Sequence, residues 1–246
     1  MIKILIVVLL LVFVYFIVLN DMVFKDRSVY FYKEPYTTQN FPKIIHQTWK
    51  TKNLDENQKK WQKTILDTYP DYEYKLWDDE DIENFVKNEF AWYYDTWKKL
   101  NPFIKKIDTV RYMWMYKFGG IYFDLDMIVY KRMDHLLDDK PGSAFIPTCH
   151  SIPYWFRDWD CASPAVLASY PGNSIWIDML KQVEKDIDRP VLYCTGPRGL
   201  SNLLREIHKR KPENKTNLVF LSEPRLGVGL KLLAKYSMHI NTGTWS

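Results

Sequence analysis

The chain has 246 residues, a length at which one α/β domain can bury a sizeable hydrophobic core. Hydrophobic residues make up 47% and charged residues 26%, and nine glycines and thirteen prolines are too few for a collagen-like or low-complexity chain. The net charge of +4 comes from 34 basic and 30 acidic side chains that are intermingled, so no basic run indicates nucleic-acid binding.

The first predicted element is a membrane segment near the amino terminus. Residues 4–19 contain no charge and no turn former, and they lie between Lys3 and Asn20. As a helix this run would be about 24 Å long, short of the roughly 30 Å hydrocarbon core but sufficient with its flanks at the interfaces. A cleaved signal peptide is the alternative, although the run lacks a small-x-small cleavage site. We therefore expect a single-pass signal anchor over residues 1–20, whose orientation the flanking charges do not decide.

After this segment, residues 21–41 are predicted to form a polar and aromatic stem, and residues 42–246 the folded domain. Within the domain, hydrophobic periodicity and turn residues predict strands at 43–49, 72–77, 121–130, 144–146 and 218–221. They predict helices at 55–69, around 82–86, and at 103–118, 175–187 and 198–208. This order indicates an α/β fold with a mostly parallel central sheet, in which sites lie outside the carboxyl ends of the strands.

Asp124 and Asp126 fall at such a place, directly after an apolar strand. Asp-x-Asp spacing alone is uninformative, because it occurs four times and the pairs at 79/81 and 186/188 fit helix capping or a solvated helix end. Between apolar strand residues, however, two carboxylates are costly unless their charge is compensated. Oxygen ligands of this kind suit Mg²⁺ or Mn²⁺ bound together with substrate phosphates. An acidic pair neutralised by a cation such as Arg111 is the alternative.

Asp108 and Arg111 stand three residues apart on the helix that precedes this strand. They therefore share a face of the helix, and taken alone they indicate a salt bridge on the helix surface. Gly119 and Gly120 are expected to end the helix and to turn its end back toward the strand that carries the carboxylates.

Several separated motifs together resemble one known family. Residues 42–49 (Pro-Lys-Ile-Ile-His-Gln-Thr-Trp) resemble its opening strand, and Asp108-x-x-Arg111 with Gly119-Gly120-Ile121-Tyr122-x-Asp124-x-Asp126 resembles its central signature. Three further segments resemble later blocks of this family, namely Ala162-Ser163-Pro164, Thr195-Gly196-Pro197, and His239 with Trp245. The chain thus resembles the DXD-containing glycosyltransferases of family 32, and especially the compact sphingolipid-type mannosyltransferases among them.

This resemblance implies a GT-A fold that binds a nucleotide sugar together with Mn²⁺ or Mg²⁺. The implied enzyme is a retaining hexosyltransferase, with GDP-mannose as the favoured donor, a UDP-sugar as the alternative, and a glycan or glycolipid as the acceptor. Together with the predicted anchor, the resemblance implies a single-pass membrane protein, in type II orientation in the Golgi or secretory pathway of a eukaryotic cell.

The resemblance also implies roles for the residues of the central signature. Asp126 is expected to hold the cation, and Asp124 to be a second ligand or a ribose contact. Asp108 and Arg111 become contacts to the hydroxyl groups and phosphates of the donor. Such a site would stabilise the negative charge that develops on the nucleoside diphosphate leaving group.

Outside the signature, Trp49 resembles the aromatic residue that stacks on the nucleobase, with a buried core tryptophan as the alternative. His239 resembles a third contact to the metal or diphosphate, with a surface histidine as the alternative. Asp158 and Asp160 are candidate acceptor contacts or part of a solvated loop. The sequon at 214–216 would matter only on a lumenal face.

Two other classes of protein also place acidic or aromatic residues in this way. A phosphatase of the haloacid dehalogenase type would use Asp124 as a nucleophile, but its motif has Thr or Val where this chain has Ile128. A membrane-tethered carbohydrate-binding module would explain the aromatic content of 16% without catalysis. The combination of Asp108 and Arg111 with the Asp-x-Asp pair favours the transferase over the binding module.

Overall fold

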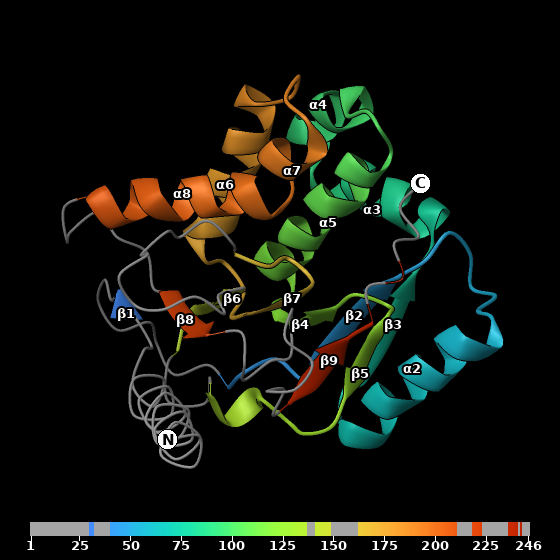
Figure 1. Cartoon of the computed structure of the whole chain (residues 1–246). Helices are drawn as coiled ribbons and strands as arrows, with labels where there is room; N and C mark the ends of the chain where they lie inside the picture. Colours follow the sequence, from blue (N-terminus) through green and yellow to red (C-terminus); the bar gives the residue numbers. More distant parts are fainter. Residues whose placement is uncertain are drawn as a thin grey trace, which may run out of the picture.

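The centre of the protein is a seven-stranded sheet with helices on both faces (Figure 1). The computed structural model describes residues 30–31, 40–136, 141–148, 162–210, 218–222, 236–240 and 242. Its strands are Tyr30–Phe31 (β1), Ile44–Thr48 (β2), Glu73–Trp77 (β3), Gly120–Phe123 (β4), Met127–Val129 (β5), Ala144–Thr148 (β6), Val166–Ser169 (β7), Leu218–Ser222 (β8) and Ser237–His239 (β9). Its helices are Glu56–Thr68 (α2), Asp79–Glu89 (α3), Ala91–Tyr93 (η1), Tyr94–Lys99 (α4), Ile104–Lys117 (α5), Asp134–Leu136 (η2), Ser174–Lys185 (α6), Val191–Cys194 (α7) and Pro197–Lys209 (α8).

The sheet has the strand order β1-β8-β6-β7-β4-β2-β3 and is mixed, so the α/β class is confirmed but the expected mostly parallel sheet is wrong. The pairs β2–β3, β2–β4 and β6–β8 run parallel, whereas β4–β7, β6–β7 and β1–β8 run antiparallel. The difference comes largely from β7, a strand that the sequence analysis did not predict. All four residues of β7 are buried, so it lacks the alternation of polar and apolar residues that reveals a half-exposed strand.

Alternate residues of the central strands face two separate hydrophobic cores. Tyr122 and Leu167 belong to the core beneath α3, α5, α6 and α8. Ile121, Phe123 and Val166 belong to the core beneath α2 and β5. Figure 1 shows α5, α6 and α8 on one side of the sheet and α2 on the other. The carboxyl end of β4 therefore emerges between two packed layers.

The turn into β4 depends on two glycines with left-handed backbone angles, φ +66° at Gly119 and +82° at Gly120. A Cβ at Gly120 would lie 2.3 Å from the carbonyl oxygen of Ile44, and one at Gly119 would lie 2.5 Å from that of Ser169. Only glycine permits both the backbone angles and this approach. The turn thus lets β4 begin between β2 and β7.

His46 holds this turn from the adjacent strand β2. Its Nδ1 accepts a hydrogen bond of 3.2 Å from the Trp77 indole N–H, so Nε2 carries the proton and donates to the Gly119 carbonyl at 3.1 Å. The imidazole stacks on the rings of Trp77, Trp114 and Phe118. Burial lowers the pKa of His46 to about 3, so the ring is neutral at physiological pH.

The strand predicted over residues 121–130 is divided into β4 and β5 by a tight turn. The Met127 N–H donates to the Asp124 carbonyl at 3.2 Å, which closes the turn around Leu125 and Asp126. After the turn, β5 leaves the main sheet and pairs antiparallel with β9, with Met127 opposite His239. The Asp-x-Asp pair therefore occupies a turn between two sheets.

The predicted membrane anchor at residues 4–19 lies outside the described residues. Among the helices in the described ranges, none combines the length and apolar character needed to cross a bilayer. Within the predicted stem, Tyr30 and Phe31 pair antiparallel with Val219 and Leu218 of β8.

Candidate active site

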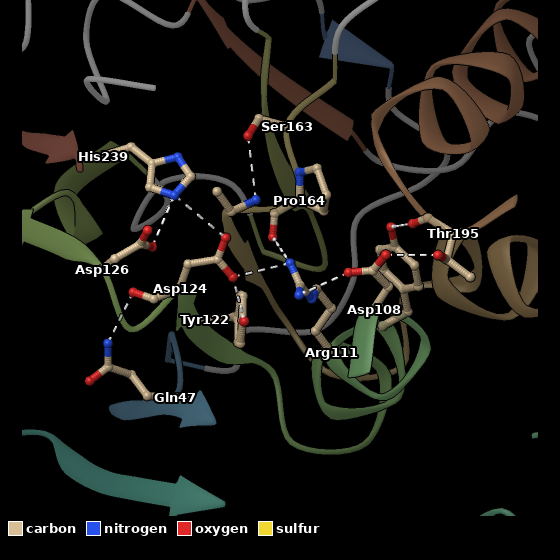
Figure 2. Close-up of polar contacts among 12 residues, drawn as sticks. Gln47, Asp108, Arg111, Tyr122, Asp124, Asp126, Ser163, Pro164, Thr195 and His239 are labelled. Atoms are coloured by element: carbon tan, nitrogen blue, oxygen red, sulfur yellow. Dashed lines mark hydrogen bonds and ion pairs between the residues drawn. The ribbon is translucent and has the colours of Figure 1, made fainter. Parts of the chain in front are cut away.

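Asp124, Asp126 and His239 meet at the carboxyl end of β4, and their candidate ligand atoms all lie within 4.8 Å of one another. His239 Nε2 is 3.0 Å from Asp126 Oδ1 and 3.9 Å from Asp124 Oδ2. Figure 2 shows the imidazole directed at both carboxylates. The two aspartates are 6% and 7% exposed, and the His239 side chain is 14% exposed. The alternative that His239 is a surface histidine is therefore wrong.

The pairing of β9 with β5 brings His239 to this place. The N–H groups of Tyr130 and Lys131 donate to the Tyr236 carbonyl, and the Ile240 N–H donates to the Asp126 carbonyl at 3.0 Å. Backbone hydrogen bonds on both sides of His239 thus fix its distance from the turn. This part of the carboxyl-terminal segment forms one wall of the site.

Asp126 is held by donors on both of its oxygens. His239 lies at Oδ1, while the Thr242 N–H and hydroxyl donate to Oδ2 at 2.9 and 3.1 Å. Burial alone would raise the pKa of Asp126, but these hydrogen bonds and the charge of His239 outweigh it and bring the pKa to about 2. Conversely, burial opposes the protonated form of His239, and the hydrogen bond to Asp126 and the charge of Asp124 raise its pKa.

On the other side of Asp124, Arg111 is buried between two carboxylates (Figure 2). Its Nη2 is 2.9 Å from Asp108 Oδ1, and its Nη1 is 3.2 Å from Asp124 Oδ1 and 3.0 Å from the Pro164 carbonyl. The expected salt bridge on a helix surface is therefore wrong: the side chains of Asp108 and Arg111 are 8% and 2% exposed. The cause is that α5 is covered along most of its length, because it packs on the sheet and on α6.

Tyr122 and Thr195, to which the sequence analysis assigned no role, complete this network. The Tyr122 hydroxyl donates to Asp124 Oδ1 at 2.6 Å, and its ring lies under the Arg111 guanidinium at 4.7 Å. The Thr195 hydroxyl donates to Asp108 Oδ2 at 2.7 Å. Both residues fall within motifs quoted for the family resemblance, which is the signal that marked them.

The charges of this network do not balance. Asp108 and Asp124 share the one guanidinium of Arg111, whereas Asp126 contacts His239. The three carboxylates therefore carry two more negative charges than Arg111 offsets when His239 is neutral, as an imidazole that ligates a metal is. Burial raises the pKa of both Asp108 and Asp124, against the opposing effect of Arg111. Such a buried excess of negative charge suits a divalent cation, and carboxylate oxygens with one imidazole form a suitable donor set.

A pocket of about 200 Å³ opens beside Asp126, between the amino-terminal half of α2 and the turn after β4. Trp49 is half-buried and lines this pocket, so the alternative of a buried core tryptophan is wrong. The buried hydroxyl of Thr48 also faces no hydrogen-bond partner among the described residues. The lining residues are Thr48, Trp49, Asp55, Asn57, Gln58, Trp61, Leu125, Asp126 and Thr242.

The remaining residues singled out from the sequence, which are Asp158, Asp160, Trp245 and the sequon at 214–216, lie outside the described part of the chain. Their assignments stay predictions.

Comparison with known protein families identifies the family that has this arrangement of residues. Residues 55–142, which include α5, β4 and the turn, match the family described as a glycosyltransferase sugar-binding region containing a DXD motif. The chain belongs to the DXD-containing glycosyltransferases. The resemblance stated from the sequence motifs is thereby confirmed.

The relatives of this glycosyltransferase chain include two fungal proteins. Inositol phosphoceramide mannosyltransferase 3 of Schizosaccharomyces pombe is 39% identical over 181 residues, which cover 68% of this chain and 46% of the relative. A mannosyl phosphorylinositol ceramide synthase of Saccharomyces cerevisiae is 30% identical over 220 residues, which cover 86% of this chain and 52% of the relative. The chain thus spans about half the length of these relatives.

A solved structure, the PaToxG glycosyltransferase, is also similar to this chain, with 18% sequence identity and a TM-score of 0.48. The similarity covers 79% of this chain and 76% of that one.

Proposed function

We propose that this protein is a metal-dependent retaining glycosyltransferase of GT-A fold that transfers mannose from GDP-mannose to a glycolipid or glycan. The observation that supports this most is the convergence of Asp124, Asp126 and His239 at a strand end, beside a pocket walled by Trp49. The names of the two fungal relatives support mannose as the sugar and an inositol phosphoceramide as the acceptor. A UDP-sugar donor is the second candidate.

The three converging side chains would hold Mn²⁺ in preference to Mg²⁺, because Mg²⁺ takes oxygen ligands and His239 contributes a nitrogen. The bound cation would stabilise the charge of the nucleoside diphosphate as the glycosyl bond breaks. Thr242 keeps Asp126 ionised and oriented toward His239 through its two hydrogen bonds. Asp126 is therefore the principal ligand in this proposal.

The donor would lie between this metal site and the pocket. The half-buried indole of Trp49 is suited to stacking on the nucleobase, and Asp126 lines the same pocket, so the diphosphate would reach the metal site. Arg111 and Asp108 are proposed to act at the phosphates and at the hydroxyl groups of the sugar. The guanidinium of Arg111 contributes positive charge 3.2 Å from Asp124, and Asp108 fixes its orientation from the other side.

The predicted anchor at residues 4–19 would keep the domain close to a lipid acceptor, in line with single-pass membrane localisation. This localisation and its type II orientation are part of the proposal.

The phosphatase alternative is disfavoured by the surroundings of Asp124. Its Oδ1 accepts the Tyr122 hydroxyl and lies 3.2 Å from Arg111, so Oδ2 alone would have to serve both a cation and attack on a substrate phosphorus. A carbohydrate-binding module would need no buried cluster of three ionisable groups beside its aromatic pocket. Both observations favour the transferase.

The test uses the full chain in detergent micelles with radiolabelled GDP-mannose, an inositol phosphoceramide acceptor, and Mn²⁺, Mg²⁺ or a chelator. We expect transfer with Mn²⁺ and none with the chelator, and Asp126→Asn should abolish transfer. Asp95→Asn is the matched control, because Asp95 is exposed on α4 and pairs only with surface lysine Lys98 among the described residues. Equal turnover by Asp126→Asn and the wild-type enzyme would overturn the metal site, and transfer from a UDP-sugar alone would replace the donor.

A further inference from the structure

Gln47 is a fully buried polar residue in β2, the strand between β3 and β4. A buried primary amide is costly unless its donors and its acceptor are used. Its neighbour His46 faces the aromatic cluster beneath α5, so Gln47 projects to the opposite face, toward α2. The amide of Gln47 is therefore placed where a strand residue would ordinarily be apolar.

The amide is satisfied by a chain of hydrogen bonds that crosses the sheet. The Gln62 amide on α2 donates to the Tyr74 hydroxyl at 3.0 Å, and that hydroxyl donates to Gln47 Oε1 at 2.7 Å. Gln47 Nε2 then donates to the Asp124 carbonyl at 3.1 Å. This last hydrogen bond of the chain is drawn in Figure 2. Because a carbonyl only accepts, the nitrogen of the amide must face Asp124 and the oxygen must face Tyr74. All the donors point the same way, so the bonds polarise one another.

The end point of this chain is the carbonyl that closes the turn of the Asp-x-Asp pair. It accepts from Met127 N–H within the turn and from Gln47 across the sheet. The N–H of the same residue, Asp124, donates to the Ala165 carbonyl at 2.8 Å. Asp126 is the third residue of this turn, so its direction follows from how the turn is held. Gln47 thus ties the turn to β2 at the atom where the turn closes.

We infer that Gln47 is a positioning residue for the metal site, and that Tyr74 supports it by fixing the orientation of its amide. The inference rests on the proposed function, since it concerns how Asp124 and Asp126 are held for a cation. Residues behind metal ligands orient the ligands, and their loss typically weakens metal binding or activity by about 10- to 100-fold. The role is distinct from closure of the turn itself, because the hydrogen bond from the Met127 N–H to the Asp124 carbonyl does not involve Gln47.

The test compares two variants that each remove one polar group of this hydrogen-bond chain while nearly keeping the side-chain volume. Gln47→Met removes both bonds of the amide, and Tyr74→Phe removes only the hydroxyl between Gln62 and Gln47. Tyr93→Phe is the matched control, because the buried Tyr93 hydroxyl donates to the Leu180 carbonyl, which lies on α6 and not at the site. All are made in the full chain in detergent, and Mn²⁺ binding is measured by isothermal titration calorimetry.

We expect Gln47→Met to weaken Mn²⁺ binding by about 10-fold or more. Tyr74→Phe should weaken it by a smaller factor, and the control should bind as the wild-type enzyme does. In transfer assays, the Mn²⁺ concentration for half-maximal activity should rise for both variants. The turnover at saturating Mn²⁺ should change much less, a separation that a general loss of stability would not give.

The outcomes separate this inference from the proposed function. If the wild-type chain binds no Mn²⁺, the metal site itself is overturned, and the role of Gln47 with it. If the wild-type chain binds Mn²⁺ and both variants bind it equally well, only the role of Gln47 and Tyr74 is overturned. Should Gln47→Met lose its cooperative thermal transition, Tyr74→Phe decides the question, because unchanged affinity in that variant contradicts the inference.

Discussion

His239 Nε2 lies 3.0 Å from Asp126 Oδ1, although the two residues are 113 positions apart in the chain. The antiparallel pairing of β9 with β5 produces this contact, and no other strand of the described chain pairs with either of them. The geometry of the candidate metal site therefore depends on a small sheet formed by a segment near the carboxyl terminus. A disturbance of that pairing should affect the site before it affects the main core.

His239→Ala should weaken Mn²⁺ binding by about 10- to 100-fold, because it removes one of three converging donors and exposes Asp126 to water. The midpoint of thermal unfolding should move little, since the His239 side chain lies outside both hydrophobic cores. Calorimetric titration with Mn²⁺ and a thermal scan on the same sample check both parts. Unchanged Mn²⁺ affinity would remove His239 from the set of proposed ligands.

Trp49→Ala should weaken binding of the donor nucleotide. Replacement of an aromatic residue that stacks on a base typically costs about 1–3 kcal/mol of binding free energy. Trp92→Ala is the matched control, because Trp92 is 59% exposed and belongs to η1, away from the pocket. Titration of both variants with GDP in the presence of Mn²⁺ is the measurement. Equal losses of affinity in the two variants would contradict the assignment of Trp49 to the nucleobase.

The sequence predicted the five longer helices, which are α2, α3, α5, α6 and α8, and most of the central strands because their signals are local. Asp78 illustrates such a local signal, since it caps α3 and accepts the N–H of Asp81, three residues further along the chain. The antiparallel strand β7 was missed because Val166–Ser169 is short and buried on both faces, which gives no periodic pattern. Strand direction in the sheet was therefore mispredicted as well.

At the site, the sequence motifs marked Asp124, Asp126 and His239, and the fold brings the three together. What could not be read was the set of partners that depends on long-range packing. Arg111 reaches the Pro164 carbonyl only because β7 lies beside β4, and Thr242 reaches Asp126 only because β9 pairs with β5. No spacing in the sequence encodes such contacts.

Arg111→Met should destabilise the folded chain by about 3–5 kcal/mol, because it leaves Asp108 and Asp124 buried without their cation. Chemical denaturation measures the loss. Adding Asp108→Asn to Arg111→Met should recover part of the stability, since one of the two uncompensated carboxylates is then neutral. A loss below about 1 kcal/mol for the single variant would be the value of a solvent-exposed pair and would contradict the buried position of Arg111.

The lowered pKa of His46 predicts how the free energy of unfolding responds to acid. Its pKa is about 3 in the folded chain and 6.5 as the ordinary value, so between these pH values the unfolded chain binds more protons. Stability should therefore fall as the pH is lowered from about 6.5 toward 3, with a contribution from His46 of up to about 1.4 kcal/mol per pH unit. Above pH 6.5 this contribution is constant, because the imidazole is neutral in both states.

His46→Gln removes this titration while keeping an amide N–H that can donate to the Gly119 carbonyl. The variant should be less stable at pH 7, since it loses the stacked imidazole, but its unfolding free energy should fall less steeply between pH 6 and 4. Denaturant unfolding at several pH values measures both slopes, with His135→Gln as the control because His135 is exposed on η2. Parallel slopes for His46→Gln and the wild-type chain would show that His46 is not held neutral beneath α5.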